Sequence, residues 1–277
     1  MDSEFVIMFP AYATEGNVEE IEKFALVLKE QYPNAIVVPL LNTSPDSEFG
    51  LARLKSELDS KGCASTIVSG SHPNLGGLVR VLNHGYSHIS VMYPELPIVR
   101  IDPREHPVDA IDFLVDKAVK DQTMIVADLS FDSNTIVQGS PDHAAHTWVF
   151  PGIYSVATGR FDLGVSCAHG FQFFPPGRKC GQIAKLALDI LQEAANEAKS
   201  SISWGWDGAM ILAAAYLQRY CLVSAGVRII RCPVQAIEIR DRELQKVTGQ
   251  LRHHVAICLA ARAVFGKLEA RTKSHDN

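Results

Sequence analysis

The chain has 277 residues, of which 47% are hydrophobic and 21% are charged, and its formal net charge at pH 7 is −5. This apolar content is sufficient for one large α/β domain with its own core. The negative charge gives no general attraction for nucleic acid or for an anionic membrane, and no apolar run reaches the ~18 residues of a membrane span, so we expect neither partner.

The N-terminus and the cysteines indicate a cytoplasmic protein. The acidic first residues, 1–4, lead directly into a strand pattern, so we expect no signal peptide. The six cysteines are scattered and form no C-x-x-C pair. Free thiols in a reducing compartment account for this pattern better than disulfides or a zinc site do.

The first half of the chain alternates strand-like and helix-like segments. An apolar run at 5–9 predicts a buried strand, and the apolar spacing of 18–31 predicts a helix that Asn17 caps. We further expect a loop at 10–17, a strand at 35–41, a helix or part of one at 47–58, a short strand at 65–69, a glycine-rich loop at 70–77, a helix at 78–83 and a strand at 89–92. This repeated order predicts a mainly parallel sheet with helices on both faces.

The second half of the chain is less regular. Prolines make the segment 94–107 irregular. We then expect a helix at 109–119, a strand at 124–129, a polar loop or hairpin at 128–141, a strand at 161–167, a turn at 173–177, a helix at 180–199, a second apolar helix starting within 204–209, a strand at 222–230 and a long helix at 244–268. No linker or repeat divides the chain, so we predict a single α/β domain, 1–268, with a mixed central β-sheet flanked by helices, followed by a polar, frayed tail at 269–277.

The stretch 173–231 is the best candidate for a ligand site. Aromatic and charged side chains fall at the predicted ends of its elements, namely Phe173, Trp206, Asp207 and Arg231. In α/β proteins, ligands bind where the ends of several elements meet at one edge of the sheet. We therefore expect these side chains to lie close together.

The order of the motifs resembles the nucleoside phosphorylase and nucleosidase superfamily, and uridine phosphorylase most of all. The segments that carry this resemblance are 6–25, 66–77, 163–166, 173–177, 205–209 and 226–231. They are similar, in turn, to the family's first strand with its phosphate loop and helix, its second glycine-rich loop, its strand and Phe-Tyr-Pro-Gly turn, its Glu-Met-Glu-Ser-Ala motif and its strand ending in arginine. The resemblance implies the nucleoside phosphorylase architecture and a nucleoside ligand.

The resemblance also implies roles for the later residues. Asp207 falls at the glutamate that holds the ribose hydroxyls, and a carboxylate can accept hydrogen bonds from two adjacent hydroxyls. Trp206 falls at the methionine that lies under the sugar. Arg231 matches the arginine that contacts the base, so Asp207 and Arg231 are the expected catalytic residues.

The remaining expected substrate-binding residues follow from the same resemblance. Phe173 falls at the aromatic beside the base, where stacking is chemically reasonable, and Phe174 follows it. Arg178 and Lys179 fall near the family residues that read uracil. His72 lies in the second glycine-rich loop.

The phosphate side departs from the family's pattern. The segment 10–17 has no arginine where the family has Gly-Asp-Pro-x-Arg, and 92–95 stands where the family has Arg-x-Gly-Thr-Thr-Gly. A phosphate ion needs guanidinium or ammonium partners. Phosphate is therefore expected as a co-substrate only if Arg80, Arg100 or Arg104 provides the charge; otherwise the nucleophile is water. No cofactor is expected.

Three functions remain open from the sequence. The first is cleavage of the N-glycosidic bond of a pyrimidine nucleoside. The second is a catalytically inactive paralogue that acts as a binding or oligomeric regulatory protein. The third is an unrelated α/β hydrolase with a metal held by histidines of 71–72 and 142–146, whose spacing carries no metal signature.

Two further expectations concern assembly and local structure. The resemblance implies a homo-oligomer, a dimer or a hexamer, and His253 and His254 are expected on the surface or at an interface. The glycines of 70–77 are expected to make a tight turn rather than a phosphate cradle.

Overall fold

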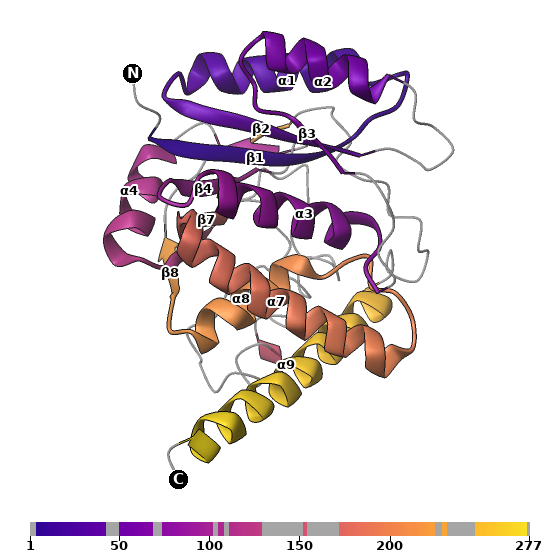
Figure 1. Cartoon of the computed structure of the whole chain (residues 1–277), viewed down its shortest axis with the longest axis vertical. Helices are drawn as coiled ribbons and strands as arrows, with labels where there is room; N and C mark the ends of the chain where they lie inside the picture. The colour runs from indigo at the N-terminus through magenta and orange to yellow at the C-terminus, as the bar shows by residue number, and fades with distance from the viewer. Residues whose placement is uncertain are drawn as a thin grey trace.

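A seven-stranded mixed sheet forms the centre of the molecule, with the strand order β3-β2-β1-β4-β7-β6-β8 (Figure 1). The computed structural model describes residues 4–42, 50–68, 74–101, 105–107, 111–128, 152–153, 172–224, 229–231 and 247–275. The strands of the sheet are β1 (Phe5–Tyr12), β2 (Ala35–Asn42), β3 (Thr66–Ile67), β4 (Pro97–Arg100), β6 (Met124–Asp128), β7 (Gln172–Pro176) and β8 (Tyr220–Ser224). Two more strands, β5 (Glu105–Pro107) and β9 (Ile229–Arg231), pair in a separate sheet.

The direction of the strands confirms a mixed, mainly parallel sheet. β1 pairs in parallel with both β2 and β4, β2 with β3, and β6 with β8. Only β7, among the strands of this sheet, runs against its two neighbours, β4 and β6. The six other strands therefore share one direction, and their carboxyl ends lie at one edge of the sheet.

Helices cover both faces of the sheet, as expected. They are α1 (Val18–Gln31), α2 (Leu51–Ser60), α3 (Gly77–Met92), α4 (Ile111–Asp121), α7 (Gly177–Ala198), α8 (Trp206–Tyr216) and α9 (Val247–His275). Buried residues of α1, α2 and α4 form one core cluster with the sheet, and those of α3, α7, α8 and α9 form the other. Figure 1 shows α1 and α2 above the sheet and α3, α7 and α9 below it.

The alternation of side chains along β1 explains why two cores form. Phe5, Ile7 and Phe9 belong to the cluster under α1, whereas Val6 and Met8 belong to the cluster under α3. Successive side chains of a strand point to opposite faces. Because both faces are apolar, β1 is a continuous hydrophobic run, as is usual for the inner strands of a parallel sheet.

Several predicted elements are confirmed and others are wrong. The helix 18–31 is confirmed residue for residue, but β1 continues to Tyr12, through the first residues of the expected loop. The expected strand at 89–92 is wrong, because α3 continues to Met92. A short apolar run fits a helix or a strand equally well, and only the length of the element decides between them.

The proline-rich and aromatic segments are also more regular than expected. The segment 94–107 contains β4 and β5, and residues 172–176 form β7 rather than part of a turn. The expected strand 222–230 is divided between β8 and β9, and α9 continues through most of the expected tail, to His275. The expected strand at 161–167 lies outside the described residues.

None of the helices in the described ranges is long and apolar enough to span a lipid bilayer.

Candidate functional site

The order of the strands reverses at β1. The chain passes from β1 to β2 and β3 on one side and then returns through α3 to β4 on the other side. The parallel order β3-β2-β1-β4 is the order of strands around the switch point of doubly wound nucleotide-binding sheets. In open α/β sheets, ligands bind outside the carboxyl ends of the strands at such a switch point. A ligand site is therefore expected at this switch point.

Pro10 limits the pairing of β1 with β4. The backbone N–H of Ile101 donates to the carbonyl of Met8 at 2.9 Å, and the next donor on that side of β1 would be residue 10. Proline has no backbone N–H, so the ladder cannot continue. On its other side, β1 pairs with β2 up to Tyr12 and Asn42. The last residues of β1 thus extend past the end of β4.

A buried ion pair lies at the carboxyl end of β4. Arg100, the last residue of β4, is 2% exposed and binds Asp207 through Nη1. The same Nη1 donates to Oε1 of Gln172 at 3.4 Å. Gln172 is opposite Arg100 in the register of β7, and Asp207 lies in the first turn of α8. The start of α8, where the helix dipole favours an acid, is thereby fixed to the switch point.

Asp207 keeps accepting capacity in this arrangement. Its side chain is 16% exposed, and Arg100 contacts Oδ1. An ionised carboxylate has about four lone-pair positions on its two oxygens. Asp207 can therefore accept hydrogen bonds from a ligand while Arg100 holds its orientation.

Aromatic side chains surround this ion pair on the α3 side. Tyr86 stacks on Trp206, with ring centroids 5.7 Å apart, and meets the edge of Phe174 at 5.2 Å. Burial raises the pKa of Tyr86 well above its ordinary value, and the nearby Arg100 opposes this only in part. Trp206 and Phe174 are 1% and 0% exposed, so here they pack in the core and do not face a ligand.

Phe173 lies on the opposite face of the sheet. It packs with Val99, Ile125 and the buried residues of α4, whereas Phe174 and Trp206 belong to the cluster under α3. The two phenylalanines are neighbours on β7, so their side chains must point to different faces. The structure therefore does not bring Phe173 and Trp206 together.

Arg178 and Lys179 lie at the other edge of the sheet from Asp207. β7 runs from Gln172, opposite Arg100, to Pro176, opposite Pro97 at the amino end of β4. α7 starts directly after Pro176. Arg178 is exposed there and pairs with Glu95 at 3.1 Å. These two residues cannot share one small ligand with Asp207 in this arrangement.

Two predicted site residues remain, Arg231 and His72, and only the backbone of Arg231 belongs to the described part of the structure. Arg231 lies in β9, with Glu105 of β5 opposite it, in the small sheet and not in the seven-stranded one. Its side chain, like all of His72, lies outside the described residues.

A second polar group lies at the carboxyl ends of β1 and β2. Arg80 of α3 donates from Nη2 to Oδ1 of Asn42 at 2.9 Å, and Asn42 is only 5% exposed. The side chain of Asn17 donates to the carbonyl of Tyr12 at 2.8 Å and accepts from the N–H of Thr14. Asn17 is at the N-cap position of α1 but makes no capping bond with its side chain. It shapes the loop after β1 instead.

The start of α3 does not offer a phosphate cradle. The N–H of Gly76 donates to the carbonyl of Ile202 at 2.8 Å, and the N–H of Val79 donates to the carbonyl of Ser203 at 3.4 Å. Gly77 has φ +45°, and a Cβ there would lie 3.1 Å from the carbonyl oxygen of Ser203. The two glycines therefore permit close packing against 202–203, which occupies backbone donors that an anion would need.

Histidines of α9 support α8 rather than facing solvent. His254 is 3% exposed, so its expected surface position is wrong. Nε2 of His253 lies 2.7 Å from the carbonyl oxygen of Trp204, just before α8. Within the described ranges, no three His, Cys, Asp or Glu side chains converge as metal ligands do. The histidines of 142–146 lie outside those ranges.

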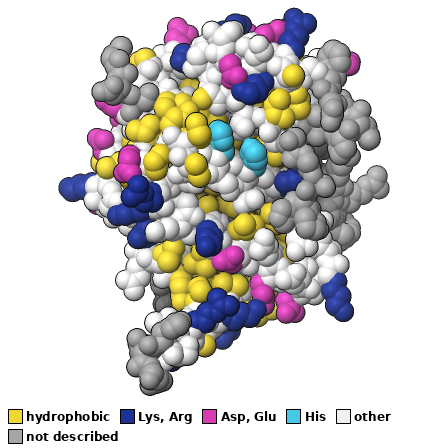
Figure 2. Space-filling view, in the orientation of Figure 1, with side chains coloured by type: hydrophobic (Ala, Val, Ile, Leu, Met, Phe, Trp, Pro, Cys, Tyr) yellow, Lys and Arg dark blue, Asp and Glu magenta, His cyan; other side chains and the backbone are white. Residues whose placement is uncertain are grey.

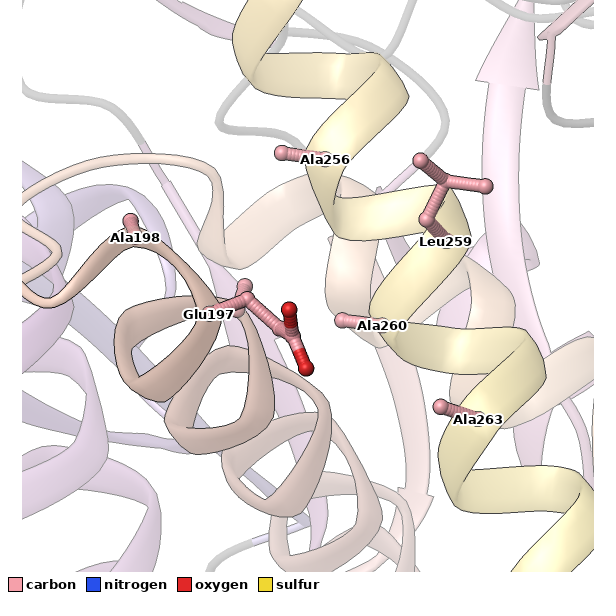
Figure 3. A pocket seen from close by; sticks show the side chains of 7 residues that line it. Glu197, Ala198, Ala256, Leu259, Ala260 and Ala263 are labelled. Carbon is pink, nitrogen blue, oxygen red and sulfur yellow. The ribbon is translucent and has the colours of Figure 1, made fainter.

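A surface groove of about 350 Å³ lies between α7 and α9. Figure 3 shows that alanines of both helices line it and that the carboxylate of Glu197 points into it. Leu259, 60% exposed, stands at its rim. The groove shares no residue with the polar groups at the switch point and offers one carboxylate among small apolar side chains.

Sequence comparisons do not assign this chain to a known family. Neither a scan against protein-family models nor a search of curated proteins finds a match to the chain.

Proposed function

We propose that this protein binds a nucleoside at the carboxyl edge of β1 and β4, with Asp207 holding the ribose hydroxyls. The observation that carries the proposal is the reversal of strand order between β1 and β4, with the buried pair of Arg100 and Asp207 at that point. Sheets of this order bind nucleotides at this edge. A carboxylate that one arginine orients is suited to accept two neighbouring hydroxyl groups.

For the reaction, we propose hydrolysis of the N-glycosidic bond of a pyrimidine nucleoside. Such cleavage passes through an oxocarbenium-like sugar, so a residue that fixes the ribose contributes by orientation. The resemblance of the sequence motifs supports this chemistry. Water is the proposed nucleophile because Arg100, one of three arginines that could replace the family's phosphate ligands, is already paired with Asp207.

Kinship with the nucleoside phosphorylases rests on the order of the sequence motifs. The resemblance implies that Phe173, Asp207 and Arg178 act on one ligand, whereas they occupy different faces and edges of the sheet. This separation favours the second candidate, an inactive paralogue that binds a nucleoside without turnover.

Uridine is expected to stabilise the protein against heat. A ligand that binds only the native state adds about 2.7 kcal/mol at 100 times its Kd, so the melting temperature should rise with the concentration of uridine. Thermal melts with uridine, cytidine, adenosine and ribose test this. Uracil release, followed by chromatography with and without phosphate, then decides between the candidates.

The results of the thermal melts and of the uracil-release assay distinguish the candidate functions. Release of uracil at equal rates with and without phosphate supports hydrolysis, and stabilisation without release supports the inactive binder. Release that requires phosphate overturns the choice of water. If no nucleoside changes the melting temperature or loses its base, the proposed function is wrong.

The expected homo-oligomer is a separate proposal. Light scattering after gel filtration measures the molar mass directly, and a mass of 30.3 kDa, that of one chain, would contradict a dimer or a hexamer.

A further inference from the structure

The last helix, α9, has apolar side chains on two sides. Ile257, Ala261 and Val264 are buried in the core cluster that α9 shares with α3, α7 and α8. Val255 and Leu259, one turn apart on the outer side, are 40% and 60% exposed. On the face shown in Figure 2, hydrophobic side chains also gather between α7 and α9. Single exposed apolar residues are ordinary, but a group of them on one side of a helix indicates a contact surface.

Four residues on the outer side of α9 form a hole for one further side chain. Ala256, Leu259, Ala260 and Ala263 line the groove between α7 and α9. They occupy positions i, i+3, i+4 and i+7, so they are neighbours on the helix surface. In coiled coils, four residues in this arrangement accept one side chain of the facing helix. Three of the four are alanines, so the groove stays open, with a volume of about 350 Å³. We call these four residues the α9 hole.

The side chain that fits the α9 hole stands beside it on the same helix. Figure 3 shows Ala256, Ala260 and Ala263 directed toward α7, with Leu259 next to them. If two copies of α9 lie parallel and level, Leu259 of one copy meets residues i−3, i, i+1 and i+4 of the other, which are the four residues of the hole. A two-fold axis along the helices makes both contacts at once, as an interface between identical chains requires.

We propose that two copies of this chain associate through parallel α9 helices, with Leu259 of each copy in the α9 hole of the other. The proposal rests on the shape of α9 and not on the nucleoside function, and it assigns a surface to the homo-oligomer proposed above. A small molecule suits the groove poorly. Ligand pockets present several convergent polar groups, whereas this groove offers a single carboxylate, that of Glu197.

Charged side chains flank the hole in a complementary manner. The carboxylate of Glu197, on α7, points into the groove. Arg262 is exposed on α9, and because a helix turns about 100° per residue, it lies on the flank of Leu259 that faces away from Ala260 and α7. A half-turn about an axis along α9 brings the Arg262 flank of one copy against the α7 flank of the other. Arg262 then pairs with the partner's Glu197, and such opposite charges fix the register of an interface.

The molar mass in solution tests the interface. Light scattering after gel filtration, over a wide range of protein concentration, should give at least twice the 30.3 kDa of one chain at the highest concentrations. Leu259→Glu should weaken association by at least about 100-fold, because it places a charge in an apolar hole beside the partner's Glu197. Val91→Glu is the matched control. Val91 is 77% exposed on α3, outside the proposed interface, so its replacement should leave the mass unchanged.

Further variants test the parallel arrangement. Positions 259 of two parallel, level helices face each other, so Leu259→Cys should give a disulfide-linked dimer on mild oxidation, seen on a non-reducing gel. Val91→Cys should give none. Glu197→Arg and Arg262→Glu should each weaken association by about 10-fold, and the double variant should recover most of that loss, because the pair is restored with the charges exchanged.

The results keep this proposal apart from the others. A mass of one chain at every concentration refutes both the α9 interface and the homo-oligomer. If Leu259→Glu keeps the mass of the unchanged protein, the homo-oligomer survives and the α9 interface is wrong. Failure of Leu259→Cys to cross-link, or of the double charge reversal to recover association, refutes the parallel pairing. Circular dichroism shows that each variant is folded, and the melting shift with uridine tests the nucleoside site separately.

Discussion

Replacing Asp207 with alanine is expected to lower the free energy of unfolding by about 3–5 kcal/mol, the usual effect of removing one partner of a buried ion pair. Arg100 is 2% exposed and would lose the carboxylate of Asp207. Its contact with Gln172 is long, at 3.4 Å, and involves a neutral side chain, so it does not replace that carboxylate. Urea denaturation followed by circular dichroism measures the change.

A matched variant gives the effect of an ordinary ion pair. Asp121 pairs with Lys117 at 2.6 Å on α4, and both side chains are about one-third exposed. Asp121→Asn should change stability by no more than about 0.5 kcal/mol. A loss below about 1 kcal/mol in Asp207→Ala would contradict the structural role that we assign to the buried pair.

Removing both charges separates stability from binding. Replacement of a buried ion pair by apolar side chains of similar volume is often neutral or stabilising, so Arg100→Met with Asp207→Leu should recover most of the lost stability. The same double variant should bind no uridine, because the acceptor for the ribose hydroxyls is gone. Uridine binding retained in a stable double variant would refute the role of Asp207 in the ligand site.

Replacing Gly205 with alanine should have the second large effect. Gly205 has φ +99° at the N-cap of α8, and a Cβ there would lie 2.3 Å from Cδ1 of Ile257 and 2.6 Å from Nε2 of His253. The left-handed backbone costs about 1–2 kcal/mol for a residue with a side chain, and overpacking adds about 1–3 kcal/mol. We expect a loss of about 2–5 kcal/mol, measured by the same denaturation experiment.

Gly266 provides the control for this substitution. It lies in the exposed part of α9, where a new Cβ would have no atom within 4 Å. Gly266→Ala should stabilise the protein by about 0.5–1 kcal/mol, because alanine favours the helix. Equal effects at the two glycines would mean that the close packing of α9 against the start of α8 is not what Gly205 serves.

The parts of the fold that the sequence predicts are those with a clear period and a clear end. Residues 18–31 show helical spacing between two polar turns, and α1 has those bounds. The prediction of a strand at 89–92 is wrong because Ile89 continues the buried face of α3, with Tyr86 one turn before it. In the sequence, Pro97 indicates an end of regular structure. Proline is nevertheless tolerated at the first residue of a strand, which is its place in β4.

The site is less predictable because its residues meet over long distances along the chain. The sequence separately marks Asp207 as a candidate and Arg100 as a substitute phosphate ligand, but no local pattern pairs residues that are 107 positions apart. A charged residue directly after three apolar ones, as in 97–100, could have signalled a buried partner. The faces of Phe173 and Phe174 depended on recognising 172–176 as a strand, which its two prolines hid.

The antiparallel strand β7 has a consequence for how the protein forms. Among the strands of the seven-stranded sheet, β6 is the next after β4 along the chain, but the two are not neighbours in the sheet, because β7, made from residues 172–176, lies between them. When a ribosome has released only the first 128 residues, the two strands have no shared partner and the sheet has a gap in its middle. Pairings between distant segments form slowly and leave strand edges open to aggregation in the meantime. The nascent N-terminal half therefore carries open edges at β4 and β6 until β7 is synthesised, and Arg100 meets the carboxylate of Asp207 only once α8 follows.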